Sequence, residues 1–87
     1  MALFNSYPLG QGILEEKSSL RKQFGIHLKH MRLQRARTQE QIAEAAGVSV
    51  DLISNIERGI NAPSFETLEK LACALDTSVE DLFAFKK

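Results

Sequence analysis

The segment that most constrains the fold runs from Thr38 to Gly59 and reads TQEQIAEAAGVSVDLISNIERG. Thr38 and Gln41 have the spacing of a capping box, which predicts that a helix begins there. Gly47 predicts the end of that helix, because glycine adopts the left-handed conformation at little cost. Ser49 is a favoured N-cap and Gly59 a favoured terminator, so a second helix is expected between them. The segment therefore predicts two short helices joined by a tight turn.

Each of these two helices has one apolar side. In the first, Ile42, Ala43 and Ala46 recur at helical spacing, and the small alanines allow another helix to approach closely. In the second, Ile53 and Ile56 share the inward face. The opposite face of the second helix is mostly polar, so it is free to meet a partner.

Further matching pieces extend over the stretch from Phe24 to Phe83: FGIHLKHMR, TQEQIAEAAGVS, ISNIERG, NAPSFETLEKLACAL and SVEDLF. In this order and without gaps, they resemble the phage-repressor/Cro-type (XRE) helix-turn-helix DNA-binding domain. The resemblance covers about two thirds of the chain. It implies an all-α protein with a compact five-helix, lambda-repressor-like domain at residues 18–87. Residues 1–17 are expected to form an N-terminal arm.

The apolar pattern predicts three more helices, beginning near Ser18 or Ser19, at Ser64 and at Ser78. The first should end near Arg35. It contains Gly25, which in the resembling family permits close helix packing. The residues expected to face the core are Leu20, Phe24, Leu28 and Met31 in the first helix, Phe65, Leu68, Leu71, Ala72 and Leu75 in the second, and Val79, Leu82 and Phe83 in the third.

Composition narrows the possible functions. The 87 residues suit one domain, and the absence of an apolar run near 18 residues predicts no membrane span. A single cysteine fits a reducing compartment, so a cytoplasmic protein is expected. Cys73, His27 and His30 are expected on the solvated surface. No metal site, cofactor site, nucleophile–base arrangement or phosphate-binding glycine loop is visible, so no enzymatic activity is predicted.

The charge is polarised although the formal net charge is zero. Residues 17–37 hold seven Lys or Arg and no carboxylate, whereas residues 38–85 hold nine Asp or Glu against Arg58 and Lys70. A basic first helix permits DNA binding. The acidic remainder predicts that non-specific affinity is weak.

The resemblance places three residues of the second short helix, Val50, Asp51 and Asn55, against DNA bases. Asn55 can bond adenine through its amide, or it is simply a solvated polar residue. Asp51 can accept a hydrogen bond from cytosine, or it stabilises the positive helix N-terminus. Val50 either meets a thymine methyl group or is merely exposed.

Contacts with the DNA backbone are also implied by the resemblance. Gln39 matches a phosphate-clamping glutamine that shares one phosphate with the helix N-terminal N–H groups. Ser49, Ser54, Arg58 and Asn61 are secondary phosphate candidates. For each of the five, the alternative is an exposed polar residue without that role.

Arg32 and Glu57 match positions that form a structural ion pair in the resembling family. A bidentate bond between a guanidinium and a carboxylate suits a partly buried setting. The pair is expected to tie the helix that ends near Arg35 to the end of the helix between Ser49 and Gly59.

The leading functional hypothesis is a transcriptional repressor that binds double-stranded DNA as a dimer on a palindromic operator. One recognition helix reads too few bases for useful specificity alone. Phe85 and the apolar residues of the N-terminal arm predict a homodimer contact, although the arm is alternatively a partly ordered tail. The alternative function is a protein-interaction module, such as an antitoxin or adaptor, with a protein partner.

Overall fold

Five helices make up the part of the chain that the computed structural model describes, residues 19–85. No strand occurs within this range. The predicted all-α, five-helix fold is confirmed, while the predicted arm at residues 1–17 lies outside the described residues. The helices are α2 (Leu20–Gln34), α3 (Gln39–Ala46), α4 (Val50–Glu57), α5 (Phe65–Ala74) and α6 (Val79–Leu82).

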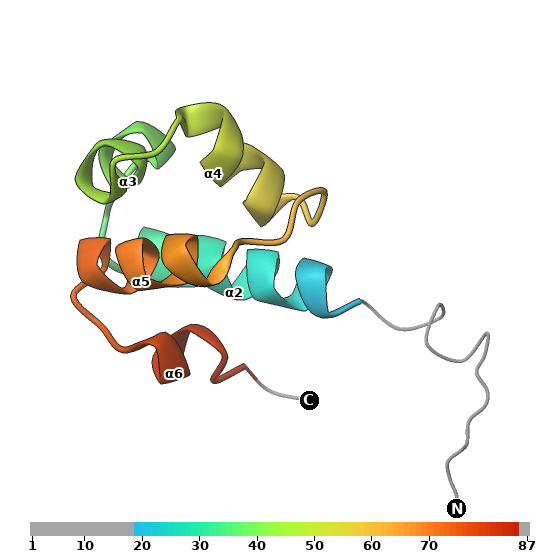
Figure 1. The fold of residues 1–87 in the computed structure, drawn as a ribbon. Helices are drawn as coiled ribbons and strands as arrows, with labels where there is room; N and C mark the ends of the chain where they lie inside the picture. Colours follow the sequence, from blue (N-terminus) through green and yellow to red (C-terminus); the bar gives the residue numbers. More distant parts are fainter. Residues whose placement is uncertain (1–18, 86–87) are drawn as a thin grey trace, which may run out of the picture.

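The helices enclose a single core. Helix α4 packs against α2 and α3, and α6 packs against α5 and α2. In Figure 1, α3 and α4 lie on one side of α2 and α5, and α6 lies on the opposite side. The largest fully buried side chains come from all five helices and the residue after α5: Phe24, Leu28, Ile42, Ile53, Ile56, Leu71, Leu75 and Leu82.

A serine or threonine caps the N-terminus of each of the five helices in the described range. In each case the side-chain oxygen accepts a hydrogen bond from a backbone N–H of the first turn. Such a cap typically contributes about 1 kcal/mol, so the caps fix where the short helices begin. The predicted capping box between Thr38 and Gln41 is present, and Gly47 ends α3 with φ of +71°. The five caps are Ser19, Thr38, Ser49, Ser64 and Ser78.

Gly25 brings α2 and α4 into close contact, as expected. A Cβ atom at this position would contact the carbonyl oxygen of Ile56 and lie 2.7 Å from that of Glu57. Both obstacles are backbone atoms, which cannot move aside as a flexible side chain can. The end of α4 is therefore held directly against the backbone of α2.

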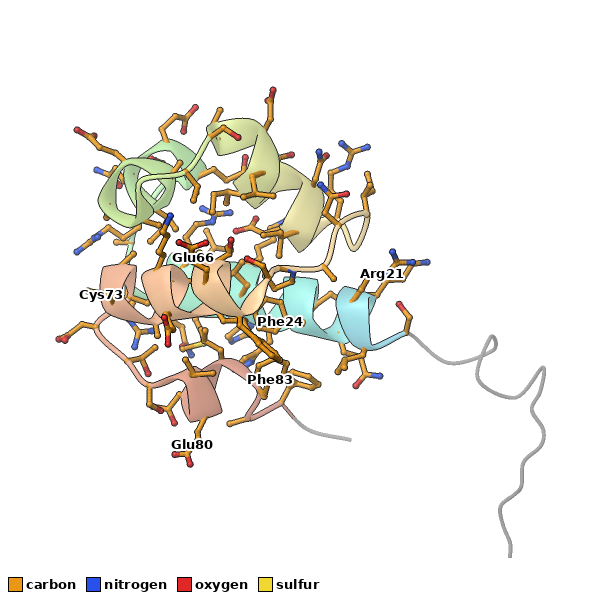
Figure 2. All side chains as sticks on the ribbon, in the orientation of Figure 1. Arg21, Phe24, Glu66, Cys73, Glu80 and Phe83 are labelled. Atoms are coloured by element: carbon orange, nitrogen blue, oxygen red, sulfur yellow. The ribbon has the colours of Figure 1, made fainter. Side chains whose placement is uncertain are left out.

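Three predicted core residues are instead exposed: Leu20 at 62%, Phe65 at 87% and Phe83 at 39%. Leu20 and Phe65 are the first residues of their helices, and helical side chains tilt toward the N-terminus, past the neighbouring elements. Phe83 lies beyond the end of α6 and covers the core edge by contacting Phe24, with ring centroids 5.0 Å apart. Figure 2 shows these two rings together on the α6 side of the molecule.

The surroundings of His27 also differ from the prediction. The side chain is half-buried, and its Nε2 lies 2.9 Å from the carbonyl oxygen of Asp81. Its ring also contacts Phe85, which is half-buried and packs against the core of the same chain. His30 and Cys73 are exposed, as predicted.

Candidate nucleic-acid interface

Helix α4 presents the three predicted base-reading residues. Asp51 is exposed, while Val50 and Asn55 are half-buried. Val50 packs partly against the core, which limits how much of it can reach a partner. The Asn55 side chain forms no hydrogen bond within residues 19–85, so its amide is available. Its backbone carbonyl accepts hydrogen bonds from the N–H groups of Ile60 and Asn61, which fix the loop after α4.

The Arg32–Glu57 ion pair lies at the junction of α2 and α4. Arg32 Nε donates to Glu57 Oε2 at 2.7 Å, and Nη2 donates to Oε1 at 3.1 Å. The side chains are only 8% and 3% exposed. The hydrogen bond with Glu57 raises the pKa of Arg32 above its ordinary value, against the opposing effect of burial. The charged pair therefore holds α4 against the scaffold.

Gln39, the predicted phosphate clamp, is the first residue of α3 and is half-buried. Its Nε2 donates a hydrogen bond to Glu57 Oε1 at 3.0 Å. The structure thus brings this residue together with the ion pair, a contact that the sequence did not reveal. One N–H of the amide remains for another acceptor.

The secondary phosphate candidates extend from the N-cap of α4 to the loop that follows this helix. Ser49 accepts a hydrogen bond from the N–H of Leu52 as the α4 cap, and its hydroxyl hydrogen remains to be donated. Arg58 and Asn61 are exposed, and Ser54 is half-buried. Their side chains form no hydrogen bond within the described range 19–85.

Some arginines of the basic stretch, residues 17–37, bind other parts of the protein. Arg21 Nη1 donates to the carbonyl oxygen of Ile60 at 3.4 Å, and Figure 2 shows Arg21 extending toward that loop. Arg35 Nε donates to the carbonyl oxygen of Leu75 at 2.8 Å, at the end of α5. With Arg32 in the ion pair, three of these cations bind the protein itself. Of these three, only Arg32 is buried and paired with a carboxylate, so only its charge is withdrawn from the surface available to DNA.

Within residues 19–85, no group of three His, Cys, Asp or Glu residues is arranged to hold a metal ion. Among the same residues, no helix is long and apolar enough to cross a membrane.

Residues 28–82 match the helix-turn-helix family designated HTH_3. The chain is 42% identical over 55 residues to the HTH-type transcriptional regulator DdrOP3 of Deinococcus deserti, covering 63% of this chain and 43% of that protein. It is 37% identical over 59 residues to the HTH-type transcriptional regulator SinR of Bacillus subtilis, covering 67% of this chain and 53% of that protein. The chain thus spans about half the length of these curated relatives.

Solved structures show the same fold. The restriction-modification controller protein C.AhdI of Aeromonas hydrophila superposes with a TM-score of 0.71 at 32% identity, over 72% of this chain and 96% of that one. The clp gene regulator ClgR of C. glutamicum gives a TM-score of 0.71 at 35% identity, over 76% and 86%. Its matched segment, its relatives and its fold together show that the chain belongs to the helix-turn-helix family.

Proposed function

We propose that the chain is a sequence-specific DNA-binding regulator, which represses transcription by occupying a palindromic operator as a homodimer. The observation that carries this proposal is the placement of α4. Its inward residues are buried and its N-terminal end is capped, while Asp51 is exposed and the Asn55 amide has no partner among residues 19–85. The regulators to which the chain is similar support the same function.

In this proposal α4 enters the major groove, where each base pair shows a distinct pattern of donors and acceptors. Asn55 is the principal base reader, since its amide can bond adenine through two hydrogen bonds. Asp51 accepts from cytosine or stabilises the α4 N-terminus, where it lies in the first turn. Gln39 and the N-terminal N–H groups of α3 hold a phosphate. Such backbone contacts set the register without carrying sequence information.

A second copy is the proposed partner at the α2 and C-terminal face. A cavity of about 470 Å³ opens there and is lined by Gln23, Ile26, His27, His30, Ala84 and Phe85. Ile26 on this face is 62% exposed, and the adjoining Phe83 is 39% exposed. Two copies that bury these groups against each other would remove apolar surface from water.

The assembly is tested by Ile26→Glu, with Leu33→Glu as the matched control on the same helix. Both residues are exposed apolar positions of α2, at 62% and 57%, but only Ile26 lines the cavity. Light scattering should show Ile26→Glu shifted toward monomer and Leu33→Glu unchanged. A wild type that stays monomeric both at high concentration and on DNA would refute this interface.

The function is tested by selecting duplexes from a random-sequence pool and titrating salt against the enriched duplex. A DNA-binding protein should enrich a palindrome, and its affinity should fall steeply and log-linearly with salt. A protein-interaction module, such as an antitoxin or adaptor, should enrich no sequence and show almost no slope. The second result would reject the proposed function.

A further inference from the structure

The hydrogen bond between Gln39 and Glu57 joins the predicted phosphate clamp to the buried ion pair. Gln39 begins α3 and Glu57 ends α4, so the bond links two helix ends that lie 18 residues apart. Gln39 is half-buried and Glu57 is buried. The contact therefore lies at the edge of the core, beside the proposed DNA-binding surface.

The hydrogen bond to Glu57 determines which end of the Gln39 side-chain amide points toward the carboxylate. An ionised carboxylate only accepts hydrogen bonds, so Glu57 must face the amide nitrogen and not the amide oxygen. One N–H of Gln39 is used by Glu57, and the second remains for an outside acceptor. A free glutamine side chain would sample many rotamers, whereas this one is held in a single orientation.

Arg32 binds the Glu57 carboxylate, which in turn accepts the hydrogen bond from Gln39. Two of its nitrogens bind the Glu57 carboxylate, and the third, Nη1, donates to the carbonyl oxygen of Arg37 at 2.8 Å. Arg37 immediately precedes Thr38, the N-cap of α3. One guanidinium thus fixes both the carboxylate that orients the clamp and the backbone from which α3 starts.

We propose that Arg32 and Glu57 are positioning residues for DNA binding, which orient the Gln39 amide before a phosphate arrives. The inference rests on the proposed DNA-binding function. With the amide already ordered, its remaining N–H and the α3 N-terminal N–H groups meet one phosphate without first losing side-chain entropy. Ordering one long side chain in advance is worth about two- to tenfold in affinity.

The decisive variant, called the apolar-pair variant below, combines Arg32→Met with Glu57→Leu. It removes one positive and one negative charge, so the net charge and the long-range attraction to DNA stay the same. Replacing both members of a buried ion pair by apolar residues is often neutral or stabilising, so the fold should persist. Gln39→Met is then made in this background and in the wild type. Gln34→Met, at an exposed glutamine of α2, is the control.

The binding probe is a labelled mixed-sequence duplex of about 30 base pairs, roughly three turns of DNA, because a phosphate contact is independent of sequence. We expect Gln39→Met to weaken binding about two- to tenfold in the wild type. In the apolar-pair variant, the loss of affinity caused by Gln39→Met should not exceed the additivity error of about twofold. Gln34→Met should have no effect in either background, and the urea midpoint of the apolar-pair variant should not decrease.

An equal Gln39→Met penalty in both backgrounds would show that the ion pair is only structural and would overturn the inference. A wild type that binds no duplex would instead reject the proposed function itself, and the inference with it. A second measurement needs neither DNA nor a variant. In the free wild type, NMR relaxation should show the Gln39 side-chain amide as ordered as the α3 backbone, and the Gln34 amide mobile. Equal mobility of the two amides would also overturn the inference.

Discussion

Arg32→Ala should destabilise the protein far more than substitution of Arg35, the residue that directly follows α2. The guanidinium donates two hydrogen bonds to Glu57 and one to the carbonyl oxygen of Arg37. Its removal leaves a carboxylate that is only 3% exposed with Gln39 as its remaining side-chain partner within the described part of the chain. The substitution therefore leaves the negative charge of Glu57 buried without its cationic partner.

Breaking a buried ion pair by removing one partner costs about 3–5 kcal/mol. Arg35→Ala is the matched control, since Arg35 is exposed and donates to two neutral carbonyl oxygens, those of Leu75 and Met31. At about 0.5–1.5 kcal/mol for each such bond, and less where water replaces it, the control should cost about 1–2 kcal/mol. An 87-residue chain has roughly 4–13 kcal/mol of total stability, so only the first change removes a large share.

Urea unfolding followed by far-ultraviolet circular dichroism measures both free energies by linear extrapolation. Arg32→Ala should show a much lower midpoint than Arg35→Ala, with similar slopes. Equal midpoints for the two variants would refute the reasoning, because they would show that water already compensates the Arg32–Glu57 pair.

Further predictions concern packing and pH. Gly25→Ala should destabilise the fold by about 1–3 kcal/mol in urea titrations, although alanine is normally the better helix former, because its Cβ meets the α4 backbone. Phe65→Ala should change stability by less than about 0.5 kcal/mol, since the ring is 87% exposed, whereas Leu68→Ala at 7% exposure should cost about 2–5 kcal/mol. The hydrogen bond from Thr77 lowers the pKa of Asp81, so its stabilisation is present above the ordinary aspartate pKa and is lost as the pH falls through the lowered value. Melting curves should therefore show Thr77→Val less stable than the wild type near neutral pH, and the difference should shrink in acid.

The helix boundaries could be predicted because they depend on neighbouring residues alone. Thr38, Ser49 and Ser64 each accept a hydrogen bond from an N–H only three residues away, so the motif is complete within one helical turn. Gly47 likewise ends α3 through its own backbone conformation. Such signals can be read from a short window of sequence.

Burial at helix ends and long-range hydrogen bonds could not be predicted in the same way. Phe65 falls on the correct face of α5, but whether it is covered depends on where the neighbouring elements stop. His27 and Arg35 bind carbonyl oxygens 54 and 40 residues away, and any residue can supply such an oxygen. For the same reason, no local sequence pattern predicts the hydrogen bond from Gln39 to Glu57, although the sequence indicates a role for each residue separately.

The base-reading role of α4 is tested most directly through Asn55→Ala, by comparing the affinity for the selected duplex with that for a mixed-sequence duplex at one salt concentration. Loss of a bidentate base contact should weaken binding to the selected duplex by about 1–3 kcal/mol and leave the non-specific affinity unchanged. Circular dichroism should show the same helix content as the wild type. If the two affinities fall together, or neither changes, Asn55 does not read a base and the proposed role of α4 is contradicted.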